Sequence, residues 1–490
     1  MLALFPEERP DYSSDYISGS SDFFAESRLS IGAAYMQANT TIRRCNKVSH
    51  GISRVVREKL SDDLVGKRLL DRAIKQSFYK AALSFLEIPP VWGSLTGIRP
   101  AKIAREAIES GATDKAAAEI LRRKYFVSPE RASMCLSAAN AAIALGRVIS
   151  PGDIALYVGI PFCRSRCSYC SFVSNSVEKD AGLVEPFVQT LLSEITAMAG
   201  MADELGMRVI SVYIGGGTPT ALSPNQLELV MRTLKESFDL SNVREYTVEA
   251  GRPDTLTEQK LDIARSLGAG RICINPQSMS DDVLAAIGRK HTPQEVLEAI
   301  RLVRQHPPEQ TAADISPGIT LNMDVIAGLP GDSPEGFRQT LDTILSCEPE
   351  NVTVHTLSLK RGSRITLENT KLPSVPEVAS MLDYANRTLR GRGYAPYYLY
   401  RQKFTTGGFE NTGWSLPGHE GMYNICMMEE LCTVLAMGGG GVTKIVLPNG
   451  RIERIFNAKY PREYILKADE TDSKIEKVRG CLPSAIPVLH

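Results

Sequence analysis

The stretch Cys163-Arg-Ser-Arg-Cys167-Ser-Tyr-Cys170 places three cysteines within eight residues, in a C-x3-C-x2-C pattern. It follows an apolar run at 156–162 that predicts a strand ending near Pro161. Three thiolates on one short loop can hold three irons of a [4Fe–4S] cluster. No fourth protein ligand lies nearby in the sequence, so the fourth iron would be open to a small molecule that binds the metal and accepts an electron.

Three other interpretations of these cysteines are less favoured. A zinc site needs a fourth ligand, usually from a second C-x2-C or a histidine pair, and neither follows at a suitable spacing. A disulfide framework is uncommon in a long chain without a secretory context. Unrelated core cysteines would be scattered, whereas three of only 10 cysteines in 490 residues stand together here.

Composition narrows the class of protein further. A chain of 490 residues is too long for one ordinary core, so two or three domains are expected. The 56 basic and 56 acidic residues cancel, so we expect no nucleic-acid partner. The sequence contains no run of about 18 apolar residues, which argues against a membrane span. Met1–Arg9 does not resemble a secretory signal, and unpaired cysteines suit a reducing compartment, so a cytoplasmic protein is expected.

The pattern of residues changes three times along the chain. Residues 1–30 are rich in Ser, Asp, Tyr and Glu and predict a flexible arm. Residues 31–150 predict a mostly helical N-terminal domain. Residues 151–362 predict a domain of alternating strands and helices, and residues 363–490 predict a smaller, aromatic-rich α+β domain.

Six strand patterns alternate with helix patterns in the third of these segments. Strands are expected at Ile154–Ile160, Val209–Ile214, Glu245–Ala250, Arg271–Asn275, Ile319–Ile326 and Val352–Leu359. Helices are expected at Glu185–Met201, Asn225–Phe238, Thr257–Leu267, Asp281–Ile287, Pro293–Arg304 and Pro334–Ser346. Repeated β/α units indicate a parallel sheet with right-handed crossovers. The pattern fits a partial (β/α)6 barrel, with a doubly wound open sheet as the alternative.

Both folds place ligand-binding residues at the C-terminal ends of the strands. The conspicuous residues stand there: Gly215-Gly216-Gly217-Thr218 after the second strand, Glu249 at the end of the third, and Asp324 in the fifth. Gln277 follows the fourth strand, and Arg289 lies twelve residues beyond it. Glycines let backbone approach a ligand closely, and an acid at a strand end is costly unless it meets a partner. Each feature alone could instead be a tight turn, a helix cap or a buried ion pair of Asp324 with Arg289.

The motif Tyr157-x-Gly-Ile-Pro-Phe-Cys163-x3-Cys167-x-Tyr169-Cys170 resembles the radical S-adenosylmethionine (SAM) superfamily. More closely, it resembles the oxygen-independent coproporphyrinogen III dehydrogenase family, which includes related haem chaperones. A Trp92-Gly-x-Leu-Thr-Gly-Ile-Arg-Pro100 stretch is similar to the branch often called HemZ-like. The resemblance implies the α/β fold of a partial (β/α)6 radical SAM barrel.

The resemblance also implies cofactors and site residues. A [4Fe–4S] cluster would be held by Cys163, Cys167 and Cys170, and SAM would chelate its open iron. Tyr157, Gly216 and Glu249 would contact that SAM, with Tyr169 inside the cysteine motif beside it. Residues Gly217, Thr218, Gln277, Arg289 and Asp324 would line the neighbouring cavity, where the dehydrogenases hold a second SAM. No residue is assigned a catalytic role.

The activity implied is the oxidative decarboxylation of coproporphyrinogen III to protoporphyrinogen IX, with a tetrapyrrole as substrate and an electron donor such as a flavodoxin or ferredoxin. The alternative is a haem chaperone that keeps the cluster and SAM, and a radical enzyme acting on tRNA is less favoured. Two positions depart from the dehydrogenase pattern, because Phe172 replaces a fourth cysteine and Gly159 replaces a histidine. Candidates for pairing with substrate carboxylates are Arg252, Arg361, Arg364 and Arg401.

Overall fold

The computed structural model of the chain describes residues 23–57, 64–170, 175–305, 319–359, 363, 365, 370–402, 405–447 and 449–482. Two compact units are present, Met1–Leu136 and Ser137–His490. None of the helices in the described ranges combines the length and the apolar character that crossing a bilayer requires.

The first unit contains a sheet that the sequence analysis did not predict. Strands β1 (Phe23–Ile31), β2 (Tyr35–Arg44) and β3 (Lys47–Val56) form an antiparallel meander. Helix α1 (Leu64–Ala82) packs on it, with the Ser77 hydroxyl 2.7 Å from that of Thr40. Gly51 of β3 is needed there, because a Cβ would collide with the carbonyl oxygen of Ser77.

This sheet corrects two expectations. Residues 23–30 are paired strand rather than a flexible arm, whereas residues 1–22 lie outside the described residues. The domain at 31–150 is not mostly helical at its start. The strands escaped detection because their exposed faces carry Ser, Thr, Arg and Glu, and β1 is held chiefly by main-chain pairing with β2 rather than by an apolar stripe. The unit continues with helices α2 (Ala101–Glu109), α3 (Asp114–Glu119), the π-helical turn η3 (Ile120–Lys124) and α4 (Pro129–Gly146), which runs into the second unit.

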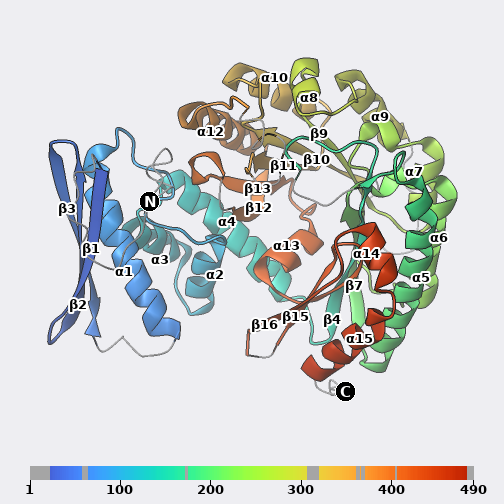
Figure 1. Cartoon of the computed structure of the whole chain (residues 1–490), viewed down its shortest axis with the longest axis horizontal. Helices are drawn as coiled ribbons and strands as arrows, with labels where there is room; N and C mark the ends of the chain where they lie inside the picture. The colour runs from blue at the N-terminus through green and yellow to red at the C-terminus, as the bar shows by residue number, and fades with distance from the viewer. Residues whose placement is uncertain are drawn as a thin grey trace. The chain divides into compact units, whose positions relative to one another are not determined.

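The second unit is built on an eleven-stranded sheet with six consecutive parallel neighbours at its centre, in the order β11-β10-β9-β8-β7-β4. These strands are β4 (Asp153–Ile160), β7 (Arg208–Gly216), β8 (Glu245–Glu249), β9 (Arg271–Gln277), β10 (Thr320–Ala327) and β11 (Asn351–Thr356). The crossover helices are α5 (Ala181–Glu204), α6 (Pro224–Ser237), α7 (Glu258–Ser266), α8 (Asp281–Ala286), α9 (Pro293–Gln305) and α10 (Pro334–Leu345). Figure 1 shows these helices following one another along the outer side of the curved sheet. The predicted α/β fold with its β/α order is therefore confirmed.

Local sequence explains where several crossover helices begin. Ser223 accepts a hydrogen bond from the Gln226 amide, and the Gln226 side chain accepts one back from the Ser223 amide. Pro224 occupies the first turn, where its missing N–H costs nothing. Ser333 before Pro334 repeats this N-terminal signal in α10. Strands β4, β9 and β10 are buried along nearly their whole length, as expected for a parallel sheet covered on its faces.

The segment after residue 362 extends the same sheet instead of forming a separate domain. Strand β13 (Glu410–Ser415) pairs antiparallel with β11, and β14 (Thr433–Gly438) pairs parallel with β4. Both edges of the parallel core are thereby covered, which removes rows of unpaired backbone groups. The remaining elements are α12 (Val375–Gly391), β12 (Ala395–Arg401), α13 (Met422–Glu429), β15 (Val442–Val446), β16 (Ile452–Phe456), α14 (Pro461–Leu466) and α15 (Glu470–Cys481).

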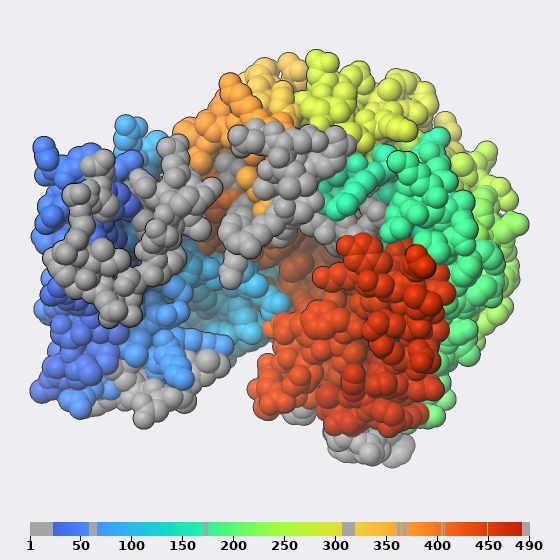
Figure 2. All heavy atoms as spheres, viewed as in Figure 1, coloured from blue at the N-terminus to red at the C-terminus, as the bar shows by residue number. Residues whose placement is uncertain are grey.

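A buried polar network fastens the C-terminal elements to α5. Glu194 accepts hydrogen bonds from the amide of Gly438 at 2.8 Å, the ammonium of Lys474 at 2.7 Å and the hydroxyl of Tyr464 at 2.5 Å. The C-terminal elements, red in Figure 2, pack against the green surface of α5. The network fixes the end of β14 beside the end of β4, where the cysteine stretch begins.

Candidate functional site

The cysteine loop, residues 163–170, leaves the end of β4 and is fastened to the neighbouring strand end. The Gly217 amide donates to the Ile160 carbonyl and the Thr218 amide to the Phe162 carbonyl, both at 2.7 Å. On its other side the Ser168 amide donates to the Ile287 carbonyl at 2.9 Å. The loop is therefore held from two directions by main-chain hydrogen bonds.

All three cysteines of this loop are partly exposed and carry thiols that form no disulfide bond within the described ranges. The Thr218 hydroxyl donates to Cys163 Sγ and the Arg252 guanidinium to Cys167 Sγ, each at 3.4 Å. Burial alone would raise the pKa of Cys167, but the guanidiniums of Arg289 and Arg252 bring it below its usual value. Thiolate character and hydrogen bonds to sulfur are what an iron–sulfur cluster requires of its ligands.

A glycine turn at the end of β7 brings backbone against this loop. Gly216 has a φ of +107°, which an L side chain rarely adopts. A Cβ on Gly217 would stand 2.5 Å from the Phe162 carbonyl oxygen. The glycines are thus required by the close approach of two strand ends, and Thr218 after them is buried against Cys163.

Glu249 ends β8 as a partly exposed acid beside three tyrosines. The Tyr213 hydroxyl donates to its carboxylate. Tyr157, Tyr213 and Tyr423 stack on one another, with ring centroids 4.4 to 6.3 Å apart. Burial and the nearby Asp324 raise the pKa of Glu249 to about 7, although the Tyr213 hydrogen bond and His355 oppose the rise. Tyr213 and Tyr423 were missed in the sequence, because an aromatic residue in a strand or helix is usually core.

Arg289 and Gln277 stand close to the cysteine loop and the end of β9. Arg289 donates to the Tyr169 hydroxyl at 3.2 Å and to the Asn275 carbonyl. Gln277 has a φ of +68°, and its buried Oε1 has no hydrogen-bond partner among the residues described. The structure thus brings Arg289 and Tyr169 together, while Gln277 combines a strained backbone with an unsatisfied side-chain acceptor.

Asp324 on β10 pairs with histidine rather than with Arg289. Its carboxylate lies 3.5 Å from His355 Nε2 and accepts a hydrogen bond from Asn322 at 2.9 Å. Burial lowers the pKa of His355, but Asp324 outweighs this and raises it above the usual value. The sequence offers His355 only as a candidate haem ligand for the chaperone alternative, whereas the structure places it against Asp324. Its second neighbour Asn411, 3.3 Å away, was not predicted as a site residue, because the sequence does not reveal how its strand pairs.

Two of the four arginines proposed to pair with substrate carboxylates lie within the described residues. Arg252 is only 2 % exposed and donates to the Ser165 carbonyl at 2.6 Å, and its assignment to a substrate carboxylate stays a prediction. Arg401 donates to the Gly408 carbonyl at 2.9 Å. Arg361 and Arg364 lie outside the described residues, as does Phe172.

Gly159 faces a turn that leaves no room for a side chain. A Cβ there would stand 2.6 Å from the carbonyl oxygen of Gly439, and one on Gly438 would collide with the Gly159 carbonyl. The histidine that dehydrogenases carry at this position is thus excluded by the neighbouring β14 turn.

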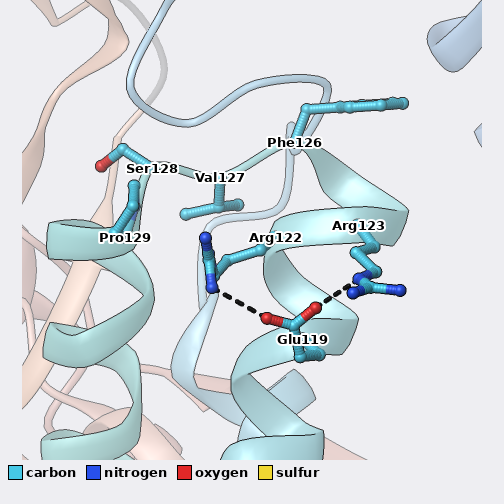
Figure 3. Close-up of a pocket in the computed structure, with 7 residues that line it drawn as sticks. All are labelled: Glu119, Arg122, Arg123, Phe126, Val127, Ser128 and Pro129. Atoms are coloured by element: carbon cyan, nitrogen blue, oxygen red, sulfur yellow. Dashed lines mark hydrogen bonds and ion pairs between the residues drawn. The ribbon is translucent and has the colours of Figure 1, made fainter.

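A hollow in the first unit has a different character. It is lined by Glu119, Arg122, Arg123, Phe126, Val127, Ser128 and Pro129. Figure 3 shows the Glu119 carboxylate between the two arginines, and its distance to Arg122 Nη1 is 2.8 Å. Glu119 forms ion pairs with both guanidiniums, so their charges are already compensated within the protein.

A parallel β/α sheet with a C-x3-C-x2-C loop after its first strand defines a radical SAM protein. The radical SAM superfamily matches residues 157–344. The chain is 37% identical over 429 residues to the "oxygen-independent coproporphyrinogen-III oxidase-like protein HemZ" of Bacillus subtilis, covering 85% of this chain and 83% of that protein. It therefore belongs to the HemZ-like branch of the coproporphyrinogen oxidase family of radical SAM proteins, whose cofactors are a [4Fe–4S] cluster and SAM.

Two other likenesses agree with this family. The heme chaperone HemW of Escherichia coli is 25% identical over 315 residues, which cover 64% of this chain and 75% of that protein. The structure of coproporphyrinogen III oxidase HemN from Escherichia coli superposes with a TM-score of 0.52 at 21% identity, covering 68% of this chain and 72% of that one. The last comparison confirms the fold.

Proposed function

We propose that Cys163, Cys167 and Cys170 hold the [4Fe–4S] cluster and leave one iron for SAM. When bound, the two groups supply a 5′-deoxyadenosyl radical. The chain's own residues position the ligands. Glu249 and Tyr157, with Gly216 of the glycine turn, contact the SAM on the cluster, and the residues Gly217, Thr218, Gln277, Arg289 and Asp324 line the space beside it. The unsatisfied Oε1 of Gln277 supports such a ligand.

We infer that the reaction is the oxygen-independent oxidative decarboxylation of coproporphyrinogen III. Removal of one hydrogen atom from a propionate side chain, followed by loss of CO2 and transfer of one electron to an electron acceptor, leaves a vinyl group. Two rounds give protoporphyrinogen IX. The observation that carries this proposal is the 37% identity over 85% of the chain with the coproporphyrinogen-III oxidase-like HemZ. A flavodoxin or ferredoxin would supply the electron for each round.

Anaerobic turnover tests this function. Reconstituted protein, SAM, a strong reductant and coproporphyrinogen III would be incubated and separated by chromatography. We expect two molecules of deoxyadenosine for each protoporphyrinogen, one for each decarboxylation. Deoxyadenosine without decarboxylation would contradict the dehydrogenase assignment while leaving the radical chemistry in place.

A haem chaperone is the second candidate, because the chain also matches HemW. A stoichiometric haem complex that passes haem to an acceptor protein, in the absence of decarboxylation, would decide for this function.

SAM affinity is expected to depend on pH through Glu249. Its pKa near 7 means that the carboxyl group is protonated below that pH and must lose the proton to accept hydrogen bonds from SAM. Affinity should therefore fall as pH drops from 7.5 to 6, by up to about tenfold per unit below the pKa. Equilibrium dialysis of SAM with the cluster-loaded protein measures this affinity at each pH. Glu249→Gln should bind SAM more weakly, and its affinity should change less with pH. An unchanged profile in that variant would refute the role of Glu249.

A further inference from the structure

We propose that Arg252 is a positioning residue for the cluster: it fixes Cys167 by a hydrogen bond to sulfur and makes the cluster easier to reduce. The inference rests on the proposed cluster site. It concerns a residue of the loop after β8, whose guanidinium reaches the cysteine loop from 85 residues away along the chain.

The contacts of Arg252 converge on one part of the cysteine loop. Its Nη2 donates to the Ser165 carbonyl at 2.6 Å, to the Ser165 hydroxyl at 2.8 Å and to Cys167 Sγ at 3.4 Å. One nitrogen thus binds the backbone two residues before the sulfur and the sulfur itself. The arrangement sets both the path of the loop and the direction in which Cys167 points.

The backbone around Arg252 is constrained in a way that aims its side chain. Gly251 has a φ of +47°, and Pro253 begins the 3-10 turn η5 (Pro253–Thr255) directly afterwards. Thr255 closes this turn by donating its hydroxyl to the Arg252 carbonyl at 2.8 Å. The backbone that carries the Arg252 side chain is therefore held in one conformation by this loop.

Arg252 is a buried charge without a carboxylate. Within the described ranges, no acid lies within ion-pair distance of it, and its Nη1 has no hydrogen-bond partner. Arg289, also buried, donates to carbonyls and to the Tyr169 hydroxyl, and it likewise interacts with the Cys167 thiol. Buried cations are costly unless a negative charge compensates them. Three thiolates carrying a cluster would supply that charge.

The charge of the cluster determines the direction of the effect. A [4Fe–4S]2+ core with three thiolates has a formal charge of minus one, and its one-electron reduced form has minus two. A nearby buried cation stabilises the more negative form, so it raises the reduction potential. Removing Arg252 should make the cluster harder to reduce.

Arg164 is a matched control because it joins the cysteine loop to the same loop after β8, and its bonds there go to Asp254 rather than to a sulfur. Its guanidinium donates to the Asp254 carboxylate at 3.1 Å, and its side chain is 49% exposed. Arg164→Met therefore removes a positive charge and a loop contact, but the charge is solvated and already paired with an acid.

The experiment compares the wild-type chain, Arg252→Met, Arg252→Lys and Arg164→Met after anaerobic reconstitution. Iron and sulfide are assayed, and the cluster is titrated against redox mediators with its electron paramagnetic resonance signal as the readout, without SAM. In Arg252→Met the ratio of reduced to oxidised cluster at a given potential should fall about tenfold, equivalent to a midpoint about 59 mV more negative. Arg252→Lys should shift less, and Arg164→Met should match the wild type.

Each outcome bears on a distinct claim. Failure of Arg252→Met to load iron, with Arg252→Lys loaded and shifted, supports the positioning role. Wild-type midpoints in both Arg252 variants would overturn the proposal, as would an equal shift in Arg164→Met. Lower thermal stability of iron-free Arg252→Lys would also overturn it, because it would mark a role in folding. If the wild-type chain itself holds no cluster, the proposed cluster site fails instead.

Discussion

Cys163→Ala is expected to abolish deoxyadenosine formation, to less than about a thousandth of the wild-type rate. The variant retains two of the three thiolates of the loop, so a three-ligand cluster loses one corner and the SAM-binding iron is no longer held in place. Iron content after anaerobic reconstitution and deoxyadenosine release with SAM and reductant are the measurements. Cys167→Ala and Cys170→Ala should behave alike.

Cys347→Ala is the matched control for this loss. Cys347 is a free, partly buried thiol at the end of α10, where it donates weakly to the Thr343 carbonyl at 3.5 Å. This variant should load iron and cleave SAM as the wild type does. Full activity in Cys163→Ala, or a loss of activity common to all four variants, would contradict the assigned ligand set.

Gly217→Ala is expected to have the second large effect. Its Cβ would stand 2.5 Å from the Phe162 carbonyl oxygen and 2.9 Å from that of Ile160, so backbone must move. The two hydrogen bonds that fasten the cysteine loop to the end of β7 would lengthen or break. We expect about 1–3 kcal/mol of lost stability from the overpacking, and SAM binding weakened at least about tenfold.

Thermal unfolding and equilibrium dialysis of SAM with the loaded protein measure these two effects. Gly200→Ala in α5 is the control, because a Cβ there meets open space and alanine favours a helix by roughly 0.5–1 kcal/mol. Its stability should stay unchanged or rise. Wild-type SAM affinity in Gly217→Ala would show that the glycine turn does not contact the ligand.

The parallel core could be read from the sequence because its signals are local. The strand predicted at Ile154–Ile160 is found at Asp153–Ile160, and the helix predicted at Pro334–Ser346 is found at Pro334–Leu345. Buried apolar runs mark parallel strands, and a serine followed by proline marks the start of a helix. Both signals lie within a few residues of the element they predict.

The strands of the first unit escaped prediction for the opposite reason. Strands β1 to β3 carry polar side chains on a solvent-exposed face, and the buried positions that β2 and β3 turn toward α1 include small or polar residues such as Thr40, Gly51 and Ser53 beside Ile42 and Val55. No strand was predicted at β13, and the pattern at 425–436 predicted a helix, whereas α13 ends at Glu429 and β14 begins at Thr433. Their partners β11 and β4 precede them by more than fifty residues, so only the folded sheet shows that they extend the parallel core on both sides.

The sequence by itself determined the class of chemistry, because three cysteines at a fixed spacing on one loop are a local arrangement that suits an iron–sulfur cluster. The tertiary structure decided which distant side chains surround that loop. It placed Arg252 against Cys167, paired Asp324 with His355, and closed the space beside Gly159. These contacts depend on the order of strands in the sheet, and no spacing along the chain encodes that order.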